Sequence, residues 1–221
     1  MTMQEMLQHV DHTQLKAFAT WESIQVLCEE AIKYQTASVC IPQTYVERVH
    51  KEYGDRINIC TVVGFPLGYQ VTNSKILEAK ESIENGANEI DMVINISDVK
   101  NGNFVKVEEE IKSMKAACGN HILKVIIETC YLTKEEKIAM CKAVTNAGAD
   151  YIKTSTGFGT DGATMEDVIL MKKNIGAIVK VKAAGGVKTL QDLEDFIKIG
   201  CDRIGTSSAI SLVEGESTTG Y

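Results

Sequence analysis

The segment Ala149 to Gly157 places a lysine where a short apolar run meets a run of small hydroxylic residues. The apolar residues predict a buried strand and the Thr-Ser-Thr-Gly run predicts a loop, so Lys153 lies at the C-terminal end of that strand. A lysine at this position either extends its ammonium group to solvent or is partly desolvated. A desolvated amine loses its proton easily and can attack a carbonyl to form a Schiff base. This segment alone leaves both interpretations open.

A repeated junction relates Lys153 to a carboxylate. Three copies of this junction each contain a glycine that can close a helix, a small residue, a turn-forming residue and then a strand. They are Gly86-Ala87-Asn88-Glu89-Ile90, Gly148-Ala149-Asp150-Tyr151-Ile152 and Gly200-Cys201-Asp202-Arg203-Ile204. The next residues are Asp91, Lys153 and Gly205, at equivalent heights. Because alternate barrel strands share a layer of inward side chains, we expect Asp91 and Lys153 to face each other.

Three further lysines lie on predicted strands: Lys124, Lys180 and Lys182. Lys182 is closer to the C-terminal strand ends than Lys180, to which we assign no role. Two ammonium groups about 4 Å apart repel by roughly 4 kcal/mol at an effective dielectric constant of about 20, so Lys182 would help Lys153 to lose its proton. The alternative is that the lysines form buried ion pairs with Asp91 and Glu128, although such pairs stabilise proteins weakly.

Two late loops predict an anion site. The pair Gly185-Gly186 follows one strand, and Gly205-Thr206-Ser207-Ser208 is expected to follow the next and to open a helix, where backbone N–H groups bind anions. In barrels, the loops after the late strands often hold phosphate. Asp11 either reaches the barrel mouth or is a turn residue, and Cys40 either lines the pocket or packs in the core.

Helices and apolar strands alternate along the chain. Thr20, Thr133, Thr164 and Thr189 are predicted helix N-caps. With a short first strand at residues 9–13, eight strands are expected, and strands this apolar must be parallel and covered by helices. The sequence therefore predicts a (β/α)8 barrel, with an open doubly wound sheet as the alternative. We expect one domain over residues 1–221, with a flexible tail at 215–221.

Composition excludes several classes of function. The chain has 221 residues, 44% hydrophobic residues and a net charge of -7, without the basic stripe typical of nucleic-acid binding. Its seven cysteines form no C-x-x-C pair, which argues against a disulfide framework or a zinc site. The four histidines show no metal-ligand spacing. The cysteines, read as buried thiols, predict a reducing, cytoplasmic setting. With no leader and no long apolar run, we expect neither export nor a membrane segment.

Four segments together resemble the signature strands of the 2-deoxyribose-5-phosphate aldolase family. They are Glu89-Ile90-Asp91-Met92-Val93, Lys124-Val125-Ile126-Ile127-Glu128-Thr129, Tyr151-Ile152-Lys153-Thr154-Ser155-Thr156-Gly157 and Lys182-Ala183-Ala184-Gly185-Gly186. The resemblance runs from Asp11 to Ser208, nearly the whole chain. It implies a metal-free and cofactor-free class I lyase, commonly a homodimer, that reversibly cleaves 2-deoxy-D-ribose 5-phosphate to glyceraldehyde 3-phosphate and acetaldehyde.

The resemblance also implies roles for individual residues. Lys153 would form the Schiff base, Lys182 would favour its neutral form and assist proton transfer, and Asp91 would act as acid and base through a water. The implied supporting relay groups are Lys124 and Asp11, and Cys40 would line the pocket. The substrate and phosphate site would comprise Thr154, Gly185, Gly186, Gly205, Ser207 and Ser208.

Two departures from the family pattern stand out. Phe158 occupies a position where some members have a basic residue, which would remove one phosphate contact. The tail is short, but it still ends in Tyr221, which the resemblance assigns to proton transfer.

Two alternative functions remain: another Schiff-base sugar-phosphate aldolase or transaldolase, and a non-enzymic barrel that binds sugar phosphates.

Overall fold

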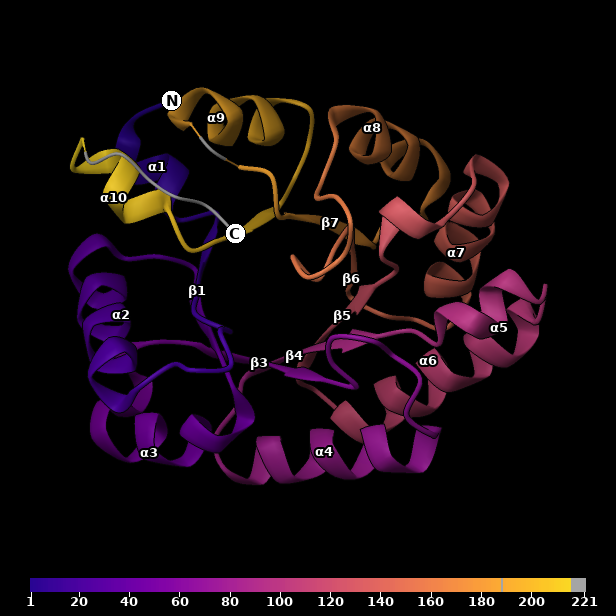
Figure 1. Ribbon diagram of the computed structural model, residues 1–221, viewed down its shortest axis with the longest axis horizontal. Coiled ribbons are helices and arrows are strands. Elements are labelled where there is room, and N and C mark those ends of the chain that lie inside the picture. The colour runs from indigo at the N-terminus through magenta and orange to yellow at the C-terminus, as the bar shows by residue number, and fades with distance from the viewer. Residues whose placement is uncertain (188, 216–221) are drawn as a thin grey trace.

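The fold is a closed barrel of parallel strands, seen in a computed structural model that describes residues 1–187 and 189–215 (Figure 1). Eight strands of this described part pair in sequence order, and β1 pairs with β8 to close the sheet. They are β1 (Val10–Thr13), β2 (Ser38–Ile41), β3 (Ile59–Val63), β4 (Glu89–Val93), β5 (Ile122–Ile126), β6 (Tyr151–Lys153), β7 (Lys180–Ala184) and β8 (Arg203–Thr206). The closure confirms the predicted barrel and excludes the open sheet.

Helices surround the barrel and connect its strands (Figure 1). They are α1 (Met3–Leu7), α2 (Trp21–Tyr34), α3 (Gln43–Tyr53), α4 (Thr72–Glu84), α5 (Ile96–Lys100), α6 (Phe104–Cys118), α7 (Lys134–Asn146), α8 (Met165–Asn174), α9 (Leu190–Lys198) and α10 (Ala209–Val213), with short 3-10 turns η1 (Gly54–Arg56) and η2 (Thr129–Tyr131). The four predicted N-caps are confirmed, because Thr20, Thr133, Thr164 and Thr189 each accept a hydrogen bond from a backbone N–H of the first helical turn.

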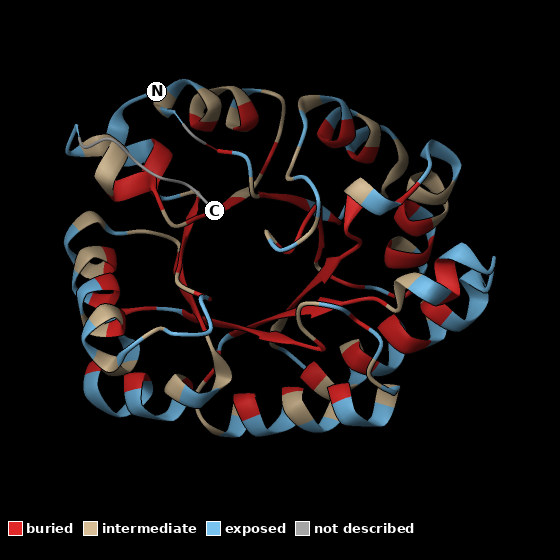
Figure 2. Ribbon diagram, viewed as in Figure 1, coloured by how far each residue is buried: buried red, intermediate tan, exposed pale blue. Residues whose placement is uncertain are grey.

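The apolar core lies between the barrel and its helices. Figure 2 shows buried residues along the strands and on the inner faces of the helices. Outward strand residues such as Val39, Ile90 and Ile152 are fully buried in this layer. Since strand side chains alternate, the residues between them point into the barrel. That interior is largely polar and charged, unlike the branched apolar filling typical of such barrels.

The three repeated junctions have the expected backbone geometry. Gly86, Gly148 and Gly200 have φ angles of +107°, +73° and +105°, the left-handed region that glycine enters without steric cost. The segment 205–206, however, lies inside β8 and does not open a helix. The helix that follows, α10, has only five residues. The prediction for this segment was therefore partly wrong.

Three further expectations concerned the cysteines, a membrane segment and the C-terminal tail. All seven cysteines are free, and six of them are buried, as predicted for thiols in apolar surroundings. Among the residues described, no helix combines the length and the apolar character needed to cross a bilayer. The predicted tail lies outside the described residues except for Gly215, and Tyr221 is therefore not placed.

Candidate active site

The predicted amine and carboxylate meet inside the barrel. Lys153 is the last residue of β6, and its side chain is only 3% exposed. Its Nζ donates a hydrogen bond to Oδ2 of Asp91 at 2.7 Å. Asp91 lies on β4, so the two strands flank β5, whose Lys124 is in register with Asp91. The expectation drawn from the repeated junction is confirmed.

Asp91 accepts hydrogen bonds from three lysine ammonium groups. Besides Lys153, its Oδ1 accepts from Lys124 at 2.9 Å and its Oδ2 from Lys182 at 2.7 Å. Burial alone would raise the pKa of Asp91, but the charges of Lys124, Lys153 and Lys182 hold it well below its ordinary value. Asp91 is therefore an ionised acceptor, and its Oδ2 lies between the two lysines nearest the mouth.

A second charged layer lies beside this trio. Asp11 contacts Lys182 at 2.6 Å and Arg203 at 2.6 Å, which confirms that Asp11 faces the interior rather than a turn. Glu89 contacts Lys124 at 2.5 Å and also pairs with Arg203. Sequence reasoning missed Glu89 and Arg203. Strand alternation could have found them, because residues two apart on a strand point to the same side. Glu89 lies two residues before Asp91, and Arg203 lies two residues before Gly205.

The charge balance of this network distinguishes Lys153 from the other lysines. Among the described residues it joins four cations, Lys124, Lys153, Lys182 and Arg203, to only three carboxylates. Burial opposes the charge on Lys182, but Asp11 and Asp91 outweigh burial and raise its pKa well above the ordinary value. Lys153 contacts a single carboxylate oxygen, Asp91 Oδ2, which Lys182 also contacts. A neutral amine at Lys153 therefore breaks fewer ion pairs than a neutral group at any other cation of the network.

Both interpretations of the lysine cluster therefore hold in part. The lysines form buried ion pairs with Asp91, as the ion-pair alternative expected. The fold nevertheless brings them together in a network that has one more cation than carboxylates. Direct repulsion between Lys153 and Lys182 is moderated by the Asp91 oxygen that both contact. Glu128, the other expected partner, forms no ion pair with any described lysine and instead hydrogen-bonds Thr156.

An apolar wall faces the charged network. It consists of Leu15, Cys40, Cys60 and Val62, with Phe65 packed against them. Cys60 donates its thiol hydrogen to Asp91 Oδ1, with a separation of 3.1 Å. Burial raises the pKa of Cys60 well above its ordinary value, whereas the hydrogen bond between Cys40 and Cys60 lowers the pKa of Cys40. Cys40 is packed among these buried residues, and sequence reasoning missed its in-register neighbour Cys60.

The predicted anion loops lie side by side at the same end of the barrel as Lys153. Gly185 and Gly186 directly follow β7, with φ angles of +72° and +80°, and β7 pairs with β8, which leads to Ser207 and Ser208. A cavity of about 520 Å³ beside α2 and α10 is lined by both serines and by Lys16 and other polar residues. The sequence did not single out Lys16.

Three residues make contacts that the sequence did not predict. Gly205 lies within β8, where a Cβ atom would come within 3.1 Å of Lys182 Cε, so its missing side chain leaves room for that lysine. The Thr154 hydroxyl accepts from the Ala184 N–H at 3.1 Å and thereby ties β6 to β7. Lys180 is exposed at the start of β7, with its Nζ 5.7 Å from the centroid of the Tyr151 ring.

Phe158 forms part of the rim above the apolar wall. Its ring is 46% exposed and meets Phe65 edge to face, with centroids 5.4 Å apart. The position that is basic in some family members therefore carries an aromatic contact here.

Two groups of potential metal ligands occur within the described residues, Cys40 with Cys60 and Asp91, and Asp11 with Cys60 and Glu89. The carboxylates in both groups already bind lysine or arginine side chains. A metal ion would have to displace these cations, so the donor set fits an ammonium network better than a metal.

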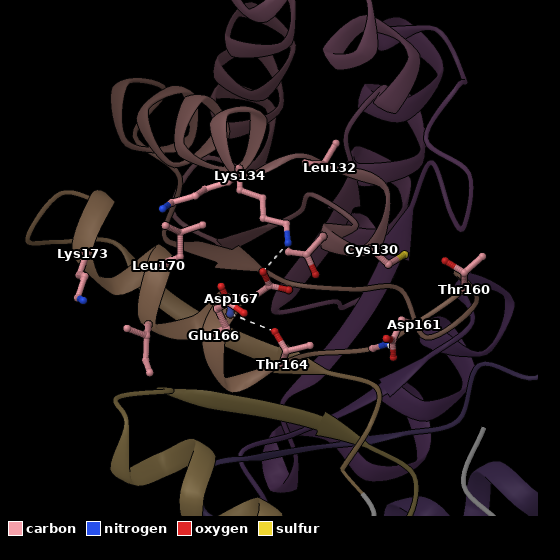
Figure 3. Close-up of a pocket in the computed structure, with 14 residues that line it drawn as sticks. Cys130, Leu132, Lys134, Thr160, Asp161, Thr164, Glu166, Asp167, Leu170 and Lys173 are labelled. Atoms are coloured by element: carbon pink, nitrogen blue, oxygen red, sulfur yellow. Dashed lines mark hydrogen bonds and ion pairs between the residues drawn. The ribbon is translucent and has the colours of Figure 1, made fainter.

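A further cavity of about 640 Å³ lies away from this network, beside α7 and α8 (Figure 3). Asp167 lies in its wall (Figure 3) and forms an ion pair with Lys137, another lining residue, at 2.5 Å. Its lining includes neither Lys153 nor Asp91. Size alone therefore does not identify the reactive site; the buried charges do.

Comparisons with known proteins point to one group of relatives. A family model described as DeoC/LacD family aldolase matches residues 1–211. A deoxyribose-phosphate aldolase of Clostridium botulinum (strain Alaska E43 / Type E3) is 67% identical and covers 98% of each chain. One of Clostridioides difficile (strain 630) is 56% identical, over 99% of this chain and 100% of the relative. The tetrameric deoxyribose phosphate aldolase of Aeropyrum pernix is 28% identical, with a TM-score of 0.88 over 97% of this chain and 92% of that chain.

Proposed function

The chain belongs to the DeoC/LacD family of aldolases, and from this premise we propose that it cleaves 2-deoxy-D-ribose 5-phosphate through an imine on Lys153. The family membership confirms the resemblance of the four strand segments. Aldolase action on deoxyribose phosphate is the activity for which its full-length relatives are named. The observation that carries the residue assignment is the buried contact of Lys153 with Asp91, beside Lys182.

The first step is the attack of the Lys153 amine on the aldehyde carbon of the open-chain sugar. The nitrogen lone pair adds to the carbonyl carbon, and loss of water leaves a protonated imine. Lys153 suits this step because a neutral Lys153 gives up only its ion pair with Asp91, which Lys182 also contacts. A neutral Lys182 would instead give up two ion pairs, one with Asp11 and one with Asp91.

Cleavage uses the imine as an electron sink. The C3 hydroxyl loses its proton, the C2–C3 bond breaks and its electron pair moves toward the imine, which releases D-glyceraldehyde 3-phosphate and leaves an enamine. Protonation of C2 and hydrolysis then release acetaldehyde and restore the amine. In the reverse direction the same steps form the carbon–carbon bond.

We assign the proton transfers to Asp91 and Lys182. Asp91 Oδ2 is 2.7 Å from the reacting nitrogen and stabilises positive charge there. Its pKa lies well below the ordinary value, so it is a poor store of protons and acts as a relay through a water. Lys182 is the neighbouring donor, and Lys124 and Asp11 hold the relay in place.

The phosphate is assigned to the two adjacent loops after β7 and β8. The left-handed glycines Gly185 and Gly186 have no side chain to cover their backbone amides, and Ser207 and Ser208 line a cavity beyond the end of β8. The apolar wall around Cys40 lies elsewhere around the mouth and suits the two-carbon fragment.

Borohydride reduction in the presence of acetaldehyde tests the assignment. Reduction traps an imine as a stable secondary amine, so the peptide containing Tyr151 should gain a two-carbon adduct. Lys153→Ala should lose both the adduct and turnover. An adduct found only on Lys182 would reverse the assignment of the nucleophile.

The same experiment separates the alternatives. Another Schiff-base aldolase or a transaldolase would not use acetaldehyde alone as donor, and a non-enzymic sugar-phosphate barrel would bind the sugar phosphate without trapping. The homodimer and the cytoplasmic location stay predictions. Light scattering of the purified chain measures the first, and the tetrameric Aeropyrum pernix relative makes a larger assembly the competing outcome.

A further inference from the structure

The strand before Lys153 departs from regular pairing at Glu128. The N–H of Ile127 donates to the carbonyl of Lys153 at 3.0 Å, and the N–H of Thr129 donates to the carbonyl of Thr154 at 2.9 Å. In a regular parallel ladder the second bond would reach Ser155. Glu128 is therefore an extra residue, a bulge that lies opposite the Lys153–Thr154 peptide.

The backbone of Glu128 is unusual for a residue with a side chain. Its φ and ψ angles are +53° and +69°, in the left-handed region. Glycine would adopt this conformation without steric cost, so a glutamate here indicates that the side chain has a use. Bulges next to active sites often redirect a side chain.

The Glu128 carboxylate is buried and holds the loop that follows Lys153. It is 2% exposed, and its Oε1 accepts the Thr156 N–H at 3.1 Å while its Oε2 accepts the Thr156 hydroxyl. The Thr156 Oγ1 in turn accepts the Phe158 N–H at 3.0 Å. Burial raises the pKa of Glu128, and the hydrogen bonds from Thr156 oppose that effect. One carboxyl group thus holds Thr156, and Thr156 in turn holds the backbone at Phe158.

The opposite side of the loop lies against the proposed phosphate site. A Cβ on Gly185 would be 3.2 Å from the Gly162 Cα and 3.7 Å from the Gly157 Cα. The Ala163 N–H donates to the carbonyl oxygens of Ala184 and Gly185, at 3.1 and 3.2 Å. The loop is therefore held by Glu128 at its beginning and by the end of β7 at its close.

We propose that Glu128 is a positioning residue that, through Thr156, holds Gly157 against Gly185 and so sets the geometry of the phosphate end of the substrate site. This inference rests on the proposed function. Glu128 acts on binding of the phosphorylated end of the substrate, and the imine chemistry of Lys153 proceeds without it.

Matched variants separate the carboxylate from the backbone bulge. Glu128→Gly keeps the left-handed backbone and removes the carboxylate, and Glu128→Gln keeps the size while removing the charge. Thr156→Val removes the hydroxyl at constant shape, and Thr156→Ser retains it. Each variant is assayed with 2-deoxyribose 5-phosphate and with unphosphorylated 2-deoxyribose, and its melting temperature is recorded.

We expect Glu128→Gly and Thr156→Val to raise KM for the phosphorylated sugar by roughly tenfold or more, with kcat within about twofold of the parent chain. Glu128→Gln should lie between them and the parent, and Thr156→Ser should match the parent. KM for unphosphorylated 2-deoxyribose and the rate of acetaldehyde trapping should not change.

Several results would overturn the inference. Equal losses of kcat with both sugars, or slower trapping, would mean that Glu128 acts on Lys153. Unchanged KM values in folded variants would make it a residue of the scaffold alone. If the parent chain cleaves the sugar phosphate and these results are obtained with the variants, only the inference about Glu128 fails. A parent chain that neither cleaves the sugar phosphate nor traps acetaldehyde refutes the proposed function as well.

Discussion

Replacing Lys182 by methionine tests what makes Lys153 reactive. Met has a similar length and no charge, so Lys182→Met removes one cation from a network of four cations and three carboxylates among the described residues. Cations and carboxylates then balance. Lys153 no longer belongs to an excess of positive charge, and its amine should react more slowly with a carbonyl.

The size of the effect follows from the shared Asp91 oxygen. Lys153 and Lys182 each lie 2.7 Å from it, so their nitrogens are separated by no more than twice that distance. Two charges about 5 Å apart at an effective dielectric constant of about 20 repel by about 3 kcal/mol. A repulsion of about 3 kcal/mol corresponds to a factor of roughly one hundred in the reactivity of the Lys153 amine.

The assay is the rate of borohydride trapping of acetaldehyde at neutral pH. This rate should fall by about a hundredfold in Lys182→Met relative to the parent chain. Lys180→Met is the matched control, because Lys180 lies on the same strand but is exposed at the other end of the barrel. Loss of a buried partner also destabilises the fold by about 3–5 kcal/mol, so trapping is measured where circular dichroism shows the variant folded.

An unchanged trapping rate in folded Lys182→Met would refute the charge argument. Burial of Lys153 would then have to account for its reactivity by itself, since desolvation also disfavours an ammonium group. An equal loss of rate in Lys180→Met would show that the effect is one of overall charge rather than of the shared contact.

Three further predictions concern Asp91, acid stability and the chain end. Asp91→Asn should still bind substrate while turnover collapses, measured as kcat against KM; a higher KM with unchanged kcat would restrict Asp91 to positioning. Since Asp11 and Asp91 have pKa values below their ordinary range, the stability they contribute is present above about pH 4 and is lost as the pH falls. Urea unfolding between pH 7 and 3 should show this loss, more weakly in Asp91→Asn, and a flat profile would contradict it. Deleting Tyr221 should slow deuterium exchange into acetaldehyde and overall turnover, with trapping at Lys153 and folded stability unchanged; equal exchange rates would leave the tail without a catalytic role.

The sequence by itself determined the repeating architecture. Helix caps at Thr20 and Thr133, glycine closures at Gly86, Gly148 and Gly200, and apolar strands between them are local signals, each set by a few neighbouring residues. Local signals of this kind survive in the folded chain because the barrel repeats one unit. The resemblance of four strand segments to one aldolase family rested on the same contiguous residues.

The sequence also identified Lys153 and Asp91, because strand alternation and equivalent junctions are enough to place both inside the barrel. It missed Glu89, Arg203 and Cys60. Each lies on a predicted strand, but its partners lie on other strands, at sequence separations from 31 residues for Cys60 and Asp91 to 192 for Arg203 and Asp11. Which inward residues contact one another depends on the register of the closed sheet.

Only the tertiary structure decided how the charges are arranged. The sequence suggested that neighbouring lysines repel, but the fold places Asp91 between Lys153 and Lys182. It also moved Gly205 from the anion loop into β8, where the missing side chain makes room for Lys182. The physical reason is that the energy of a charge depends on the distances to all its neighbours, and those distances exist only once the eight strands have closed.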